Sequence, residues 1–314
     1  MLKFVNKSRF IMLLIIFFLI SCIGCSNTEI GNPDTSSLFS MNNDAELETY
    51  LQDQYIADFQ YEESNNVAPP SDKNSDAAYK DNIISISSSK YRYDADAGMV
   101  MVFRIENNER PAEKIAEIET FGKVIKLLLN QNILIVIQTY TDSANSTGFN
   151  SNIQTGVLFI NISNPAIPER LKSIKIDGRF LDNILNNEKL YIIQQFQAEI
   201  DLQIKQQIED LSIEKFIPYY AYIDDSGQSL GFSRLVKPDD LFRPAVPSGS
   251  IMTIVTVLNI KDMFKLPQSI GFIGNIKTIS TNSTSIYLNE STNNVYKINI
   301  TKEKLFFTDL QEII

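Results

Sequence analysis

The stretch Gly156-Val-Leu-Phe-Ile-Asn-Ile-Ser-Asn-Pro165 decides the fold of this chain. Its apolar run favours a buried β-strand, and the Ser-Asn-Pro that closes it favours a turn. Next come the run Leu171–Ile176, the turn Asp177-Gly178 and the run Phe180–Phe196, which is long enough for two strands. Together these segments predict four short strands in a row.

The same outline recurs on both sides of this stretch. Gly122 lies 56 residues before Gly178 within similar strand-like runs, Gly274 takes the same position in a third copy, and a fourth copy begins at Asn294. Units of four strands that repeat at roughly 40 to 60 residues are typical of β-propeller blades. The sequence therefore predicts an all-β protein with four-stranded propeller blades, and a sandwich of similar hairpins is the alternative.

The repeats also predict the boundaries of the blades. We assign the recurring glycine to the connection after the second strand of a unit, where a tight turn requires positive φ. The predicted blades span approximately 83–153, 154–250, 251–292 and, in part, 293–314.

Closure of the ring has two possible solutions. Either residues 84–88 join the last unit and complete a small ring, or the arc stays open. We expect the open form, with free strand edges at 99–105 and 295–300 through which the chain could self-associate.

An insertion at 197–250 interrupts the second predicted blade. Ile200, Ile204, Ile208 and Leu211 lie at helical spacing, which predicts an amphipathic helix in the first part of the insertion. Long insertions on repeat scaffolds are common sites of function.

The rest of the insertion is rich in aromatic side chains, and aromatic residues on loops often anchor protein or saccharide partners. We therefore predict a partner-binding site from the following aromatic residues of the insertion: Tyr219, Tyr220, Tyr222, Phe232 and Phe242. The alternative is that these rings pack the insertion against the propeller.

The N-terminal sequence predicts where in the cell the protein is located. Residues 1–21 combine a short cationic start with the apolar run Phe10–Ile20, as in a secretory signal peptide. The run ends in Leu19-Ile-Ser-Cys22, which looks like the lipobox of bacterial lipoproteins, so we expect a lipid on Cys22 and an extracytoplasmic protein held at the bacterial cell envelope. Cys25 is the competing lipidation site, and a disulfide between the two cysteines is the other alternative.

Two flexible segments flank a predicted helix. Residues 22–42 form the expected tether, 43–61 the helix and 62–82 a linker. Asn43 and Glu46 have the spacing of a capping box at the start of this helix. The apolar residues that follow at helical spacing predict that one side of the helix docks on the propeller.

The amino-acid composition limits the kinds of partner and activity that we expect. The chain holds 28 Lys and Arg against 38 Asp and Glu, and this net charge of −10 argues against a nucleic-acid partner. Histidine is absent, so imidazole bases and histidine metal ligands are excluded. We expect no cofactor, no metal site and no enzymatic activity. A hydrolase that uses Asp224-Asp225 or Asp239-Asp240 is the alternative.

The sequence resembles the secreted β-propeller domain family of bacteria and archaea. The resemblance rests on the acidic helix at 44–51, the Asn161-Ile-Ser-Asn-Pro165 motif, the Asp177-Gly178 turn and Ile217-Pro-Tyr-Tyr220. It implies the propeller fold and an extracytoplasmic location, and it brings no catalytic residues. The chain ends about where members of the family continue with further blades. We expect a membrane-anchored binding module for a protein or saccharide, with a scaffold in envelope assembly as the alternative.

Overall fold

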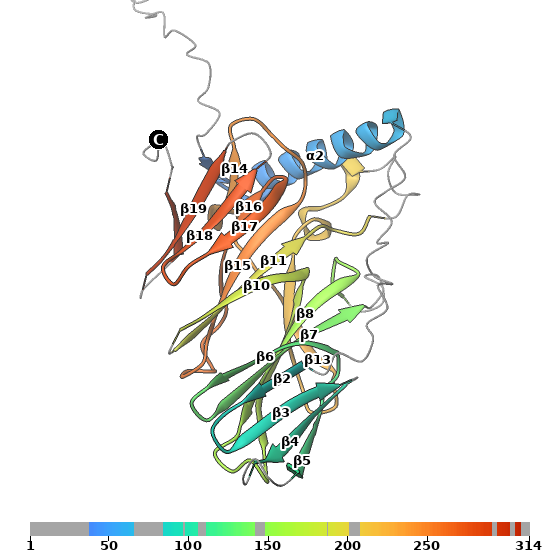
Figure 1. Cartoon of the computed structure of the whole chain (residues 1–314). Coiled ribbons are helices and arrows are strands. Elements are labelled where there is room, and N and C mark those ends of the chain that lie inside the picture. The colour runs from blue at the N-terminus through green and yellow to red at the C-terminus, as the bar shows by residue number, and fades with distance from the viewer. Residues whose placement is uncertain are drawn as a thin grey trace, which may run out of the picture.

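The computed structural model describes residues 38–65, 84–96, 98–105, 111–141, 148–186, 188–200, 208–290, 294–301 and 305–308. The predicted signal peptide, Cys22 and Cys25 lie outside these ranges, as do most of the predicted tether and linker. The described chain is almost entirely β, with strands arranged in four sheets beside one long helix (Figure 1).

Each sheet is built on four antiparallel strands that follow one another along its width, which is the arrangement of a propeller blade. Blade 1 contains β2 (Ile84–Ser87), β3 (Tyr91–Asp96), β4 (Met99–Arg104) and β5 (Glu113–Glu119). Blade 2 contains β6 (Lys123–Asn130), β7 (Ile133–Thr141), β8 (Ile153–Asn161) and β9 (Glu169–Asp177). Blade 3 contains β10 (Arg179–Asn186), β11 (Lys189–Phe196), β15 (Met252–Asn259) and β16 (Gln268–Ile273). Blade 4 contains β17 (Ile276–Thr281), β18 (Ser285–Glu290), β19 (Val295–Ile300) and β20 (Leu305–Thr308).

These blades correct the predicted boundaries. The four strands that decide the fold are β8, β9, β10 and β11, so they belong to two blades rather than one. The repeat was therefore recognised but divided at the wrong strand, because similarity between copies does not show where one sheet ends. The recurring glycines lie between the last strand of one blade and the first strand of the next.

Close backbone packing explains these glycines. Gly178 has a φ of +106°, and a Cβ atom there would lie 2.7 Å from the carbonyl oxygen of Gln195. At Gly122, a Cβ atom would lie 2.8 Å from the carbonyl oxygen of Thr139. A side chain at either position would collide with the second strand of the blade that the glycine begins.

The blades pack face to face through three buried clusters. Val100 and Leu134 belong to the cluster between blades 1 and 2, and Val157 and Ile192 to the cluster between blades 2 and 3. Phe272 belongs to the cluster between blades 3 and 4. Blades 2 and 3 are thus apolar on both faces, whereas blades 1 and 4 each contribute one face to these clusters.

The four blades form an open arc. In the described ranges, β2 pairs with β3, and no strand of blade 1 pairs with a strand of blade 4. The expected open form is therefore confirmed for the described residues, and the alternative in which 84–88 completes a ring is wrong. The predicted free edges are also wrong, because β4 and β19 each pair with a strand on both sides.

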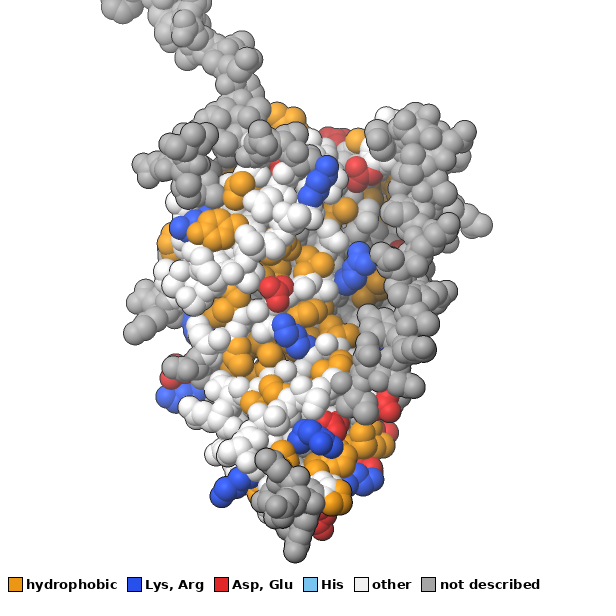
Figure 2. Space-filling view, in the orientation of Figure 1, with side chains coloured by type: hydrophobic (Ala, Val, Ile, Leu, Met, Phe, Trp, Pro, Cys, Tyr) orange, Lys and Arg blue, Asp and Glu red, His pale blue; other side chains and the backbone are white. Residues whose placement is uncertain are grey.

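The outer faces of the arc are polar. On blade 1, Arg92 lies over the ring of Phe103 and forms an ion pair with Asp94 at 2.9 Å. On blade 4, Lys297 lies over the ring of Tyr287. Figure 2 shows charged side chains together with hydrophobic ones over blade 1 at the lower end, and mainly backbone and uncharged polar side chains, drawn in white, over blade 4 at the upper left. Both outer faces are therefore compatible with exposure to solvent, as are the terminal repeats of other repeat proteins.

The insertion widens two blades. β12 (Tyr219–Ile223) pairs with β9, β13 (Ser229–Arg234) pairs with β12, and β14 (Leu241–Pro244) pairs in parallel with β16. β1 (Leu38–Ser40) pairs with β14, so the last part of the predicted tether is a strand. Local sequence reasoning missed the pairings of β12 with β9, of β14 with β16 and of β1 with β14 because each joins segments that are far apart in the chain.

The predicted helix in the insertion lies mainly outside the described residues. Residues 197–200 have no regular structure, 208–210 form a 3₁₀ turn, and 201–207 are not described. A second 3₁₀ turn, η2, spans Ile213–Lys215. The described ends of the segment are therefore not α-helical.

Helix α2 spans Asp44–Asn65 and ends later than predicted. Its capping interactions are present: Asn43 Oδ1 accepts the N–H of Glu46 at 3.0 Å, and Glu46 Oε2 accepts the N–H of Asn42 at 3.0 Å. Leu47 and Leu51 are buried in the cluster between blades 2 and 3. The predicted docking of the helix is confirmed.

Polar contacts fix α2 to the insertion. Asp44 accepts two hydrogen bonds from Arg234 at 2.8 Å, and Glu48 accepts the backbone N–H of Ile213 at 2.6 Å. Asp58 accepts the N–H of Ser250 at 3.0 Å and its hydroxyl at 2.7 Å. The acidic side of α2 therefore holds the insertion at Ile213, at Arg234 and at its last residue, Ser250.

Candidate functional site

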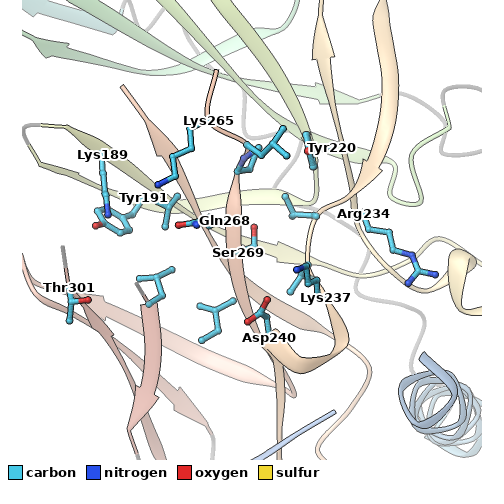
Figure 3. A pocket seen from close by; sticks show the side chains of 17 residues that line it. Lys189, Tyr191, Tyr220, Arg234, Lys237, Asp240, Lys265, Gln268, Ser269 and Thr301 are labelled. Atoms are coloured by element: carbon cyan, nitrogen blue, oxygen red, sulfur yellow. The ribbon is translucent and has the colours of Figure 1, made fainter. Parts of the chain in front are cut away.

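A groove of about 700 Å³ opens where the insertion meets blades 3 and 4 (Figure 3). One wall is the first half of β16, and a second is the segment 235–240, which includes the 3₁₀ turn η3 (Pro238–Asp240). Thr301 and Leu305 of blade 4 form a third side. Three parts of the sequence that are distant from one another thus build a single concavity.

The wall formed by β16 is a strand edge. β14 pairs with β16 only at Gly271 and Phe272, while β15 covers the other side of β16 from Gln268 to Ile273. Within the described part of the chain, no strand pairs with Gln268–Ile270 on the groove side. An exposed strand edge presents backbone N–H and C=O groups that can pair with another chain.

The charged side chains of the groove are mostly basic. Its lining includes Lys189, Arg234, Lys237, Lys265 and a single acid, Asp240 (Figure 3). Arg234 is already paired with Asp44 and Glu214, so the exposed lysines Lys237 and Lys265 supply the positive charge beside Asp240. Burial and neighbouring Asp239 raise the pKa of Asp240, while Lys237 lowers it. In a chain with a net charge of −10, this positive groove suits an anionic ligand.

The groove also has aromatic and apolar lining. Tyr191 comes from β11, which β15 separates from β16, and Tyr220 projects from β12. Tyr220 is buried and meets Tyr222 edge to face at 5.8 Å. Lys172 lies 4.3 Å from the centre of the Tyr222 ring, and burial lowers the pKa of this lysine. Tyr220 and Tyr222 are two residues apart on β12, so their side chains lie on the same face of the strand.

The other three predicted aromatic residues lie elsewhere. Tyr219 is on the opposite face of β12, where its hydroxyl donates to Glu214. Phe232 is 41% exposed and rests edge-on against Phe149 at 4.9 Å. Phe242 packs against Phe307 of blade 4 at 4.7 Å. The five rings do not form one surface, and only Tyr220 of the five lines the groove.

Asp177 fastens the insertion to blade 2. Its carboxylate is completely buried and accepts the backbone N–H groups of Asn150, Ser151 and Tyr219 at 3.1, 3.1 and 2.9 Å. Burial raises the pKa of Asp177 to about 7, although these donors and Lys175 lower it. In the sequence, Asp177 was interpreted only as part of a turn.

The acidic pairs of the insertion serve local structure. Asp224 accepts the N–H groups of Ser226 and Gln228 at 2.9 Å each, which closes the turn between β12 and β13. The hydrogen bond from the Ser226 hydroxyl, followed by the one from the N–H of Gln228, lowers the pKa of Asp224. Asp239 and Asp240 lie together in η3.

Among the residues that the structure describes, no group of three or more Asp, Glu, Cys or His side chains is placed to hold a metal ion. None of the described helices is both long enough and apolar enough to cross a membrane.

A sequence model of the family described as Beta propeller domain matches residues 81–312. Comparison with curated proteins finds no significant match. Among solved structures, a functionally unknown protein from Desulfotomaculum acetoxidans is 9% identical, with a TM-score of 0.29 over 72% of this chain and 68% of that one. The Pan2 WD40 domain of Neurospora crassa is 8% identical, with a TM-score of 0.28 over 73% and 62%. The family match includes every described blade strand from β2 to β20.

Proposed function

Because this chain belongs to the β-propeller domain family, we propose that it is a binding module that holds a protein or saccharide partner in the groove beside β16. We further propose that the module is lipid-anchored at Cys22 in the bacterial cell envelope, outside the cytoplasm. Propeller domains commonly act as interaction modules. The groove is the observation that carries the proposal.

The chemistry of the groove favours recognition. It combines a strand edge at Gln268–Ile270, the lysines Lys237 and Lys265, and apolar lining from Leu235 and Val236. Binding sites of this kind use an apolar surface for affinity and a few placed polar groups for orientation. Asp224 closes the turn between β12 and β13, whereas Asp240 lines the groove next to Asp239.

The groove is also held in shape before a partner arrives. Asp177 fixes the start of β12, and Asp44 on α2 fixes Arg234 at the end of β13. A preorganised site loses less conformational entropy on binding. The long insertion therefore supports the groove through contacts at both ends of its hairpin.

A scaffold in envelope assembly is the second candidate. Ile167 follows β8 of blade 2 and is 73% exposed, while Phe264 and Leu266 occupy the equivalent loop of blade 3 and are 97% and 64% exposed. Exposed apolar residues on neighbouring loops favour contact with another protein. Leu266 also lines the groove, so this surface borders the proposed binding site, and assembly would use Ile167 and Phe264 outside it.

Photo-crosslinking tests the proposed function. The full chain is expressed in bacterial cells with p-benzoylphenylalanine in place of Gln268 in the groove, and irradiated in the intact envelope. A matched control carries the same group in place of Tyr287 on the outer face of blade 4. We expect a discrete adduct from position 268 that is absent from position 287. No adduct from 268, or the same adducts from both positions, would contradict the proposal.

A further inference from the structure

We propose that the groove binds an acidic peptide segment in extended conformation, which adds to β16 as a further strand. This inference rests on the proposed function and names the class of partner. It uses the geometry of the strand edge, the charge of the groove and the position of β14.

The open edge of β16 favours a peptide as the ligand of the groove. β14 already adds to β16 in parallel, but its pairing is limited to Leu241 with Gly271 and Phe242 with Phe272. The chain reaches this pairing from η3, which turns away from the line of the strand. The neighbouring positions, Gln268–Ile270, are left with an edge that matches the hydrogen-bonding repeat of a polypeptide. A saccharide has no equivalent repeat of N–H and C=O groups.

The charges select an acidic segment. Lys265 stands just before β16 and Lys237 just before η3, so the exposed lysines are on two different walls of the groove. Lys189, the first residue of β11, also lines the groove. An extended segment beside β16 would point alternate side chains to its two faces. Carboxylates on one face would then be near lysines, and apolar side chains on the other would meet Leu235 and Val236.

A defined probe tests this inference on the full chain in detergent micelles. The probe is a fluorescent peptide of about eight residues, the length of an ordinary strand, with alternating glutamate and valine. Fluorescence anisotropy should show saturable binding, and a peptide in which lysine replaces glutamate should not bind. The double variant Lys237→Glu and Lys265→Glu should weaken binding about tenfold or more. Lys277→Glu, an exposed lysine of β17 outside the groove, should leave the affinity within about twofold.

Backbone methylation tests strand addition directly. In one version of the peptide every glutamate amide is N-methylated, and in another every valine amide is. Because alternate amides face opposite edges of a strand, only one version should lose binding. Equal effects of the two methylations would overturn strand addition.

The remaining outcomes separate this inference from the proposed function. In one outcome the acidic peptide does not bind, and an oligogalacturonate binds in a way that depends on Lys237 and Lys265. That result would overturn the inference of a peptide ligand and identify an acidic saccharide as the ligand. Failure of the peptide and the saccharide together with an adduct from position 268 would overturn this inference and leave the binding module intact.

Discussion

Tyr219 donates its backbone N–H across 2.9 Å to the carboxylate of Asp177, which has no exposed surface. The contact joins the last residue of β9 to the first residue of β12, which pairs with β9 to widen blade 2. The same carboxylate holds the N–H groups of Asn150 and Ser151. One buried side chain therefore fixes the place where the insertion enters the sheet.

Replacement of Asp177 by Asn should destabilise the protein. One carboxylate oxygen becomes an NH₂ group that faces a backbone donor, and a buried donor without a partner costs about 1–3 kcal/mol. The free energy of unfolding, measured by urea denaturation, should fall by about this amount. Asp225→Asn at an exposed position of the adjacent turn is the control and should have little effect. Equal stability of Asp177→Asn and the parent would show that the three contacts contribute nothing.

The same pair of proteins has a defined pH dependence. Burial raises the pKa of Asp177 from 3.8 to about 7, so between these values the folded protein binds a proton that the unfolded chain lacks. The contribution of this group to stability is therefore greatest near pH 4 and is lost as pH rises through 7. The difference in the free energy of unfolding between wild type and Asp177→Asn should shrink over that range. A difference that grows with pH would mean that the hydrogen bonds outweigh burial.

A comparison of two glycines distinguishes the cost of backbone strain from the cost of a steric collision. Gly178 and Gly231 both have positive φ, at +106° and +126°, but a Cβ atom meets Gln195 only at Gly178, and at Gly231 it meets nothing within 4 Å. Gly231→Ala should cost about 1 kcal/mol from its dihedral angles, and Gly178→Ala should cost clearly more. Thermal unfolding of the two variants measures the difference. A Gly178→Ala protein that melts with or above Gly231→Ala would contradict the close approach of β10 and β11.

Sequence periodicity predicted individual strands better than their partners. The apolar runs around Gly122, Gly178 and Gly274 identified the repeat, because the strands of a blade are local in sequence. The same runs could not show that β9 is the last of the four strands of blade 2. A strand that is apolar on both faces has the same sequence pattern whether it is the first or the last strand of a sheet. The pairings of β12 with β9 and of β1 with β14 depend on tertiary contacts that the local pattern does not contain.

The candidate site was predictable only in part. Tyr220 was expected from the aromatic composition of the insertion, and it lines the groove. The edge at Gln268–Ile270 depends on where β14 stops pairing, and the basic character of the groove depends on lysines from separate elements. Spacing along the chain gives neither of these. Phe242 shows the opposite case, because an aromatic residue of the insertion packs inside the arc against Phe307.

The proposed anchor makes a separate prediction. Cells that express the full chain and are fed an alkyne analogue of palmitate should label the protein. Labelling should be lost in Cys22→Ala and kept in Cys25→Ala, because Leu19-Ile-Ser-Cys22 has the residue order of a lipobox. The reverse pattern would move the lipid to Cys25, and labelling of both variants would refute a single modified cysteine.

Amide hydrogen exchange along β16 tests the central claim most directly, because the open edge within the groove is the basis of the proposed binding site. In the free protein, at least one amide of Gln268–Ile270 should exchange much faster than those of Gly271 and Phe272, which β14 covers. Addition of the acidic peptide should slow that amide and leave exchange in β18 unchanged. Uniformly slow exchange from Gln268 to Ile273 in the free protein would show that the edge is already covered and would contradict the account.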